Sequence, residues 1–286
     1  MNRTTPQDAA TEDTSTDAPA LEVRGLRKTF GDFTAVDGVD LTLPQGGSLA
    51  VVGESGSGKT TTARMIAGLE TPTAGSVRLN GRERFAAPRS RGAARRQFAQ
   101  EIQMVFQDPY ASLDRRQRVR DCLSEVVALH TGLRGSELDA RVGELIDQVG
   151  LDARQAGSLP RALSGGQRQR VAIARALAVR PRVLLLDEAI AALDVSVQAQ
   201  ILSLLRSIRE NSGVAYLFIT HDLGVVRHVC EDIVVMNQGR IVERGPVSSV
   251  LTEPQHPYTR DLLASVPRLG WKPVRRDHAR TLAVEE

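Results

Sequence analysis

The residues best suited to chemistry form a glycine-rich run, Gly53–Thr60, with the sequence GESGSGKT. An apolar stretch typical of a buried strand precedes the run, and an amphipathic helix pattern follows it. In that context the glycines let backbone N–H groups face one phosphate, Lys59 supplies positive charge and the Thr60 hydroxyl ligates Mg²⁺. The run therefore predicts a nucleoside triphosphate site. Its expected contacts are Gly53, Glu54, Ser55, Gly56, Ser57, Gly58, Lys59, Thr60 and Thr61.

Two adjacent carboxylates, Asp187 and Glu188, end the apolar stretch VLLLDE. Like charges at a strand end are unfavourable unless a cation lies beside them, and a metal–nucleotide would supply that cation. We therefore expect Asp187 to hold Mg²⁺ and Glu188 to polarise the attacking water. The alternative is that both acids are merely solvated in a loop.

A second anion site is predicted at Ser164, which precedes two glycines and an amphipathic helix in the stretch LSGGQRQR. Serine is a good N-cap, and a helix N-terminus attracts negative charge. Because the chain has a single P-loop, this second site needs a nucleotide from elsewhere. We expect a partner domain docked head to tail, each domain offering Ser164, Gly165, Gly166 and Gln167 to the other's terminal phosphate. An ordinary capped helix would explain the serine but not the glycines and Gln167.

Composition excludes several other classes of protein. The chain has 286 residues, 41% of them hydrophobic and 25% charged, which suits a globular protein with a proper core. A net charge of +3 and 3% aromatic residues give no indication of nucleic-acid binding. Two cysteines fit a reducing compartment, and neither a membrane-spanning run nor a secretory leader is evident. We expect a cytoplasmic location.

Strand and helix patterns alternate after residue 47, which predicts an α/β fold with a parallel sheet covered on both faces. Residues 21–52 suggest antiparallel strands with tight turns. We expect a disordered tail over residues 1–20 and one ATP-binding domain over residues 21–253. Within it, residues 86–163 have few strand signals and are expected to form a largely helical insertion, and residues 254–286 a short C-terminal extension.

Taken in order, GESGSGKT, VFQDPYASLD, LSGGQRQR, VLLLDE, AALD and the triplet Thr-His-Asp at residues 220–222 resemble the ATP-binding-cassette (ABC) ATPase subunits. The resemblance covers about residues 21–267, and its LSGGQ run is close to diagnostic. It implies a P-loop NTPase (RecA-like) core with an antiparallel β subdomain and an inserted α-helical subdomain. It also implies ATP and Mg²⁺ as cofactors, and ATP hydrolysis coupled to transport.

The resemblance assigns roles to four further residues. Phe30, in KTFGDF, matches the aromatic residue that stacks on adenine, with Phe33 a weaker candidate. Gln107 matches the residue that reaches Mg²⁺ and the attacking water. His221 matches the histidine that contacts the γ-phosphate, and Asp194 matches the acid that touches the partner across the dimer. The implied Mg²⁺ ligands are thus Thr60, Gln107 and Asp187.

The segment Ala189–Ala191 departs from the family pattern. It reads AIA, followed by Ala192, where the family commonly has Pro-Thr-Ser-Ala. Ala191 therefore lacks a hydroxyl that would bridge toward the opposite P-loop, a loss of about 1 kcal/mol of hydrogen bonding. We expect weaker communication between the sites without loss of hydrolysis.

Local features favour one branch of this family. The stretch EPQHPYTRDLLASVP, Glu253–Pro267, resembles the ATP subunits of peptide and nickel importers. That branch implies a second ABC ATPase subunit, identical or related, and membrane permease subunits at the cytoplasmic face of the membrane. It also implies an extracytoplasmic solute-binding protein that acts indirectly. An exporter subunit and a non-transport ABC ATPase switch remain open alternatives.

Overall fold

The computed structural model describes residues 18–84, 97–108 and 112–265. Its centre is a six-stranded sheet with the strand order β10-β9-β3-β8-β7-β6. All neighbouring strands in it are parallel except β10, which pairs antiparallel with β9. The strands are β3 (Ser48–Val52), β6 (Ile102–Val105), β7 (Val183–Asp187), β8 (Ala215–Ile219), β9 (Asp232–Asn237) and β10 (Arg240–Pro246).

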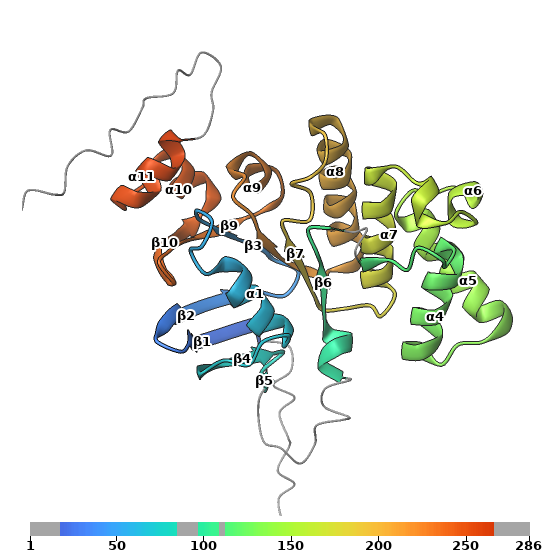
Figure 1. Ribbon diagram of the computed structural model, residues 1–286, viewed down its shortest axis with the longest axis horizontal. Coiled ribbons are helices and arrows are strands. Elements are labelled where there is room, and N and C mark those ends of the chain that lie inside the picture. Colours follow the sequence, from blue (N-terminus) through green and yellow to red (C-terminus); the bar gives the residue numbers. More distant parts are fainter. Residues whose placement is uncertain (1–17, 85–96, 109–111, 266–286) are drawn as a thin grey trace, which may run out of the picture.

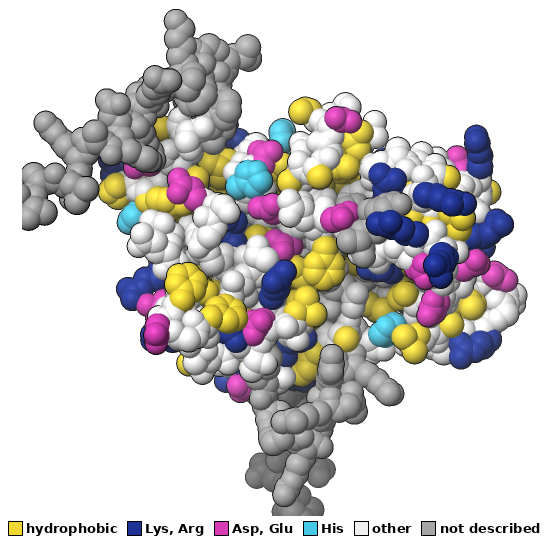
Figure 2. Space-filling model, in the orientation of Figure 1, with side chains coloured by type: hydrophobic (Ala, Val, Ile, Leu, Met, Phe, Trp, Pro, Cys, Tyr) yellow, Lys and Arg dark blue, Asp and Glu magenta, His cyan; other side chains and the backbone are white. Residues whose placement is uncertain are grey.

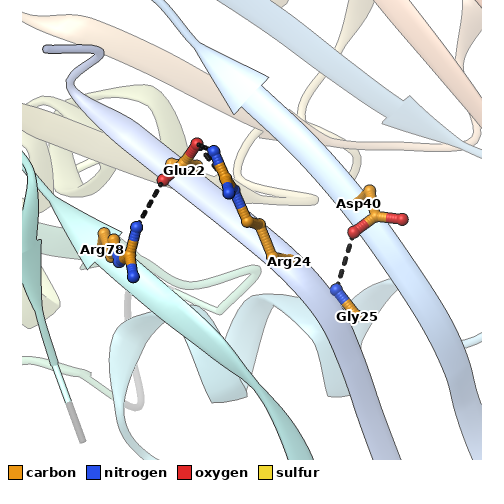
Figure 3. Close-up of polar contacts among 5 residues, drawn as sticks. All are labelled: Glu22, Arg24, Gly25, Asp40 and Arg78. Atoms are coloured by element: carbon orange, nitrogen blue, oxygen red, sulfur yellow. Dashed lines mark hydrogen bonds and ion pairs between the residues drawn. The ribbon is translucent and has the colours of Figure 1, made fainter. Parts of the chain in front are cut away.

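A second, four-stranded antiparallel sheet lies beside the first. Residues 21–52 predicted two of its strands, whereas the end of that range, residues 48–52, joins the main sheet. The second sheet consists of β1 (Leu21–Phe30), β2 (Phe33–Leu43), β4 (Ala74–Leu79) and β5 (Arg82–Glu83), in the order β2-β1-β4-β5. Polar contacts on this sheet link neighbouring strands (Figure 3). The Glu22 carboxylate accepts hydrogen bonds from Arg24 and from Arg78 of β4, and Asp40 of β2 accepts one from the backbone N–H of Gly25.

Alternate residues of the central strands pack on opposite faces of the main sheet, which explains why these strands are apolar throughout. Leu184 and Leu186 belong to the cluster under α7 (Gly165–Leu177) and α8 (Val195–Ser212), whereas Leu185 packs with α1 (Lys59–Ala67) and the smaller sheet. Helix α1 lies between the two sheets in Figure 1. A third cluster joins β3 and β9 to α9 (Leu223–Val229) and to the C-terminal helices.

The helices of the middle segment form one end of the molecule, to the right in Figure 1. They are α4 (Val119–Thr131), α5 (Gly135–Gln148), α6 (Ala153–Ala156) and the short 3₁₀ helix η3 (Pro160–Ala162). The expectation of a helical insertion from residue 86 is wrong in one respect, because β6 falls inside that range. This strand pairs with β7 in the main sheet, Val105 opposite Leu186. With only four residues, it gives too short a sequence signal to be recognised as a strand.

The N-terminal end differs from expectation in one respect, and the C-terminal extension contains a helix. Most of the 1–20 tail lies outside the described residues, but Ala20 is fully buried, so order begins before Leu21. The C-terminal extension contains α11 (Pro257–Ala264), which follows α10 (Val247–Thr252), and its residues 266–286 lie outside the described part. Within residues 18–84, 97–108 and 112–265, none of the helices combines the length and apolarity required to cross a membrane.

Candidate active site

The glycine-rich run forms a loop between β3 and α1, as predicted, and two of its glycines are sterically required. A Cβ on Gly53 would lie 2.2 Å from the Met236 carbonyl oxygen, and a Cβ on Gly58 would lie 2.6 Å from that of Ala35. Gly58 also has a φ of 100°, in the left-handed region that favours glycine. The loop is thus wedged between β9 and β2, which fixes its curvature.

Lys59 begins α1 and is almost completely buried, with 5% of its surface exposed. Its Nζ donates hydrogen bonds to the carbonyl oxygens of Gly53 and Glu54, each at 2.8 Å. Burial lowers the pKa of Lys59, while the negative charges of Glu188 and Asp187 oppose that change. The ammonium group is therefore held in the loop and faces the two carboxylates that end β7.

Asp187, the last residue of β7, is 8% exposed, and its Oδ1 has no hydrogen-bond partner among the described residues. Burial, and then the nearby charge of Glu188, raise the pKa of Asp187, whereas Arg64, Lys59 and a hydrogen bond with Thr60 lower it. An unpartnered, buried carboxylate oxygen beside a threonine hydroxyl is the donor set that Mg²⁺ prefers. These residues therefore fit the predicted metal.

Glu188 has a backbone φ of 47°, a left-handed conformation that is uncommon for a residue other than glycine. Such backbone strain tends to persist where the surrounding structure enforces it, often at functional sites. The Glu188 N–H donates to the Ile219 carbonyl oxygen at 2.8 Å, which ties the residue to the end of β8. The His221 Nδ1 lies 3.1 Å from the Glu188 Oε1. Glu188 and His221 are thus together, with Glu188 23% and His221 58% exposed.

The structure shows where two further predicted residues, Gln107 and Phe30, lie in the fold. Gln107 is exposed and follows β6 by two residues, and the last residue of β6 pairs with Leu186, so Gln107 lies at the same sheet edge as Asp187. Phe30 is 49% and Phe33 66% exposed, and they face each other across the β1–β2 turn. Neither ring is a core residue, and the Lys28 Nζ lies 4.8 Å from the centre of the Phe30 ring.

The Ser164 turn begins α7, as predicted, but its hydrogen bonds close within the chain. The Ser164 Oγ accepts from the Gln167 N–H at 3.3 Å, and the Gln167 Oε1 accepts from the Ser164 N–H at 2.8 Å, a reciprocal capping box. A Cβ on Gly166 would lie 2.5 Å from the Val197 Cγ1 of α8. Gln167 and Gly166 therefore have structural reasons for their identity, contrary to the expectation that an ordinary capped helix would not explain them.

The surface around the Ser164 turn is basic. Figure 2 shows basic side chains gathered over the end of the molecule formed by α5, α6 and α7. Arg154 and Arg161, which precede Ser164 in the chain, are exposed. Ser164 is itself exposed, as are Ala191 and Asp194 in the loop before α8. A Cβ added to Gly165 would lie 3.4 Å from the Leu193 side chain, so the Ser164 turn and the loop before α8 are neighbours. Together they form an exposed surface.

The side chain of Tyr258 contacts the P-loop, which no sequence pattern indicated. The Tyr258 Oη of α11 accepts a hydrogen bond at 2.9 Å from the backbone N–H of Glu54, 204 positions earlier in the chain. The His-Pro-Tyr stretch was singled out only for its likeness to peptide importers. No local pattern relates the two residues, because only the packing of α11 against β3 and β9 brings them together.

A buried P-loop lysine, a strand-end Asp–Glu pair and a histidine after the next strand define a nucleotide-hydrolysing P-loop ATPase. The family comparison agrees: residues 36–191 match the model described as ABC transporter, and residues 242–284 match the model described as oligopeptide/dipeptide transporter, C-terminal region. The chain belongs to the ABC transporter ATPase family. The second match begins twelve residues before the expected extension and includes residues 242–246 of β10.

Curated relatives cover most of the chain. It is 44% identical over 252 residues to the di/tripeptide transport ATP-binding protein DppF of Pseudomonas aeruginosa, covering 88% of this chain and 77% of that protein. It is 46% identical over 243 residues to the oligopeptide transport ATP-binding protein OppD of Mycobacterium tuberculosis, covering 85% of this chain and 39% of that longer protein.

Solved structures have the same fold. The structure of cbiO1 from Clostridium perfringens, part of the ABC transporter complex cbiONQ, superposes with a TM-score of 0.75 at 27% identity, covering 89% of this chain and 98% of the other. A dimeric bacterial ABC transporter cassette superposes with a TM-score of 0.70 at 29% identity, covering 79% and 98%. The expected fold, a P-loop ATPase core with a smaller antiparallel sheet, is confirmed.

Proposed function

We propose that this chain is the ATP-hydrolysing subunit of a peptide importer at the cytoplasmic face of a membrane. The observation that carries the proposal is the C-terminal region, which follows an ABC ATPase and matches the oligopeptide/dipeptide transporter model. The names of the relatives, di/tripeptide and oligopeptide transport ATP-binding proteins, support the same assignment. They favour an importer over the exporter and the non-transport switch.

In the proposed reaction, this chain's residues act on ATP held along the P-loop. Backbone N–H groups of the P-loop cradle the phosphates, Lys59 neutralises charge between the β- and γ-phosphates, and the exposed Phe30 stacks on the adenine. Glu188 accepts a proton from the attacking water, and His221, which contacts its carboxylate, orients it and touches the γ-phosphate. Mg²⁺, held by Thr60, Gln107 and Asp187, would neutralise phosphate charge when bound.

In this proposal, residues of a second ATPase subunit complete the ATP site. Its Ser164 turn would close over the γ-phosphate held by this chain's P-loop, with Asp194 at the contact between the two. Only the closed pair makes both sets of phosphate contacts, so ATP favours closure and hydrolysis reopens the pair. Membrane permease subunits would transmit this motion, and a solute-binding protein would deliver the peptide. We propose no nucleic-acid partner.

The test is growth of a deletion strain on a di- or tripeptide as the only source of a required amino acid. We expect the strain to fail on the peptide, to recover with the wild-type chain and to remain deficient with Glu188→Gln. Growth on the free amino acid is the control and should be unaffected. Normal peptide uptake in the deletion strain, measured with a labelled peptide, would refute the peptide assignment.

A further inference from the structure

Helix α11 is attached to the ATPase core by both apolar and polar contacts. Leu262 is buried in the cluster that contains Val52 of β3, and Tyr258 packs against the same cluster. The segment that leads into the helix is fixed by β10, because the Glu243 carboxylate accepts hydrogen bonds from the backbone N–H groups of Gln255 at 2.7 Å and His256 at 3.0 Å. The position of Tyr258 is therefore determined by the core.

From this position Tyr258 contacts one particular peptide group of the P-loop. Its Oη accepts a hydrogen bond from the Glu54 N–H at 2.9 Å. The carbonyl oxygen of the same peptide group belongs to Gly53, and it accepts a hydrogen bond from the Lys59 Nζ at 2.8 Å. Because the N–H and C=O of a trans peptide point in opposite directions, Tyr258 and Lys59 hold this group from its two sides.

The peptide between Gly53 and Glu54 needs such support. Gly53 has a φ of 153°, a conformation available to glycine and rarely to other residues, and glycine allows the adjoining peptide to rotate at low cost. Rotation would turn the Gly53 carbonyl away from Lys59. The Tyr258 hydrogen bond opposes that rotation, and by polarising the peptide it makes the Gly53 carbonyl a better acceptor for the ammonium group.

We propose that Tyr258 is a positioning residue of the ATP site: its hydroxyl orients the 53–54 peptide, and that peptide places the Lys59 ammonium for the phosphates. The C-terminal extension thereby acts on the nucleotide site within its own chain. This inference rests on the ATPase assignment and is independent of the cargo.

The experiment compares Tyr258→Phe with wild type in the purified full-length chain, since the substitution removes the hydroxyl and keeps the ring. We expect the dissociation constant and the KM for ATP to rise about fivefold, the effect of losing one hydrogen bond of ordinary strength, while kcat at saturation changes less than twofold. Amide exchange at Glu54 should become faster. These readouts concern the ATP site and not the cargo, so a failed peptide-uptake test leaves them unaffected.

The matched control is Tyr216→Phe, which also removes one hydroxyl hydrogen bond, in this case to the Leu205 carbonyl oxygen in the core. It should lower the Tm and leave the KM for ATP unchanged. The proposal is overturned if Tyr258→Phe binds ATP as wild type does with unchanged exchange at Glu54. It is also overturned if Tyr258→Phe lowers only the Tm, as the control does.

Discussion

Two regions of this chain are suited to bind phosphate, and they differ in how far they are complete. At the P-loop edge, Lys59 is buried, one oxygen of Asp187 lacks a partner within the described residues, and Glu188 has a strained backbone. At the Ser164 turn, the serine and Gln167 satisfy each other in a capping box on an exposed surface. The first region thus has an unpartnered polar atom and a strained backbone, whereas the polar groups of the second are paired within the chain.

The difference supports the proposed roles of the two regions, hydrolysis at the P-loop edge and closure over a partner's nucleotide at the Ser164 turn. Unpartnered buried groups and backbone strain cost folding free energy, so they persist where a ligand or a reaction uses them. A capped helix end surrounded by basic side chains has no unpaired groups that would lower the stability of the free chain. Its N-terminus can still bind an anion that a partner supplies. We therefore propose that the P-loop edge supplies the catalytic surface of a subunit and that the Ser164 turn supplies the closing surface for its partner.

The largest expected effect comes from Glu188→Gln at the catalytic surface. We expect kcat for ATP hydrolysis to fall at least about 100-fold, the usual range for loss of a general base, with ATP binding retained. Steady-state phosphate release and nucleotide-binding titrations measure the two quantities. Glu210→Gln, an exposed glutamate of α8, is the control and should hydrolyse normally. Near-normal turnover in Glu188→Gln would remove Glu188 from its assigned role.

The next effect tests the packing of the closing surface. Gly166→Ala places a methyl group 2.5 Å from the Val197 Cγ1, so we expect a loss of about 1–3 kcal/mol in unfolding free energy from overpacking. Denaturant unfolding measures it. The double variant Gly166→Ala with Val197→Ala should recover part of the loss. If the double variant is no more stable than the sum of the two single changes predicts, the contact is not the cause.

The smallest expected effect is a gain in stability rather than a loss. Asp187→Asn removes a charge that burial disfavours. In metal-free, nucleotide-free buffer we therefore expect the free energy of unfolding to rise by about 1 kcal/mol, which corresponds to about 2–4 °C in Tm. Because the pKa of Asp187 is raised, the native state keeps its proton to higher pH than the unfolded chain does. The gain should therefore be largest near neutral pH and shrink on acidification. A lower Tm for Asp187→Asn at neutral pH would contradict this explanation.

Much of the main sheet and its helices was predictable, because β3, β7 and β8 are continuous apolar runs between amphipathic helices. Strand β6 was not, since its four residues lie in a segment with polar neighbours and pair only with β7 in space. Strand β10 was also missed; its exposed and half-exposed residues give a weak pattern at a sheet edge.

The candidate site was predictable where its chemistry is local in sequence. The P-loop and the Asp187–Glu188 pair are contiguous motifs, and the structure brings them together at one sheet edge. The reason for Gly166 and the contact of Tyr258 with Glu54 were not predictable, because each depends on a helix that joins the contact only after packing. The left-handed φ of Glu188 likewise follows from its tertiary setting and has no sequence signal.

The central claim is that a catalytic surface on one ATPase subunit is completed by the Ser164 turn of another. The most direct measurement is the ATPase rate of the assembled transporter carrying Ser164→Asp. Aspartate also caps helices well, so α7 keeps its stability, but its charge would face the γ-phosphate across the contact. The control is Asp152→Ala, which removes an equivalent capping box in α6.

We predict that Ser164→Asp retains the wild-type Tm and loses at least about 100-fold in turnover, whereas Asp152→Ala loses about 1 kcal/mol of stability and keeps its rate. Wild-type turnover in the Ser164→Asp transporter would contradict the account.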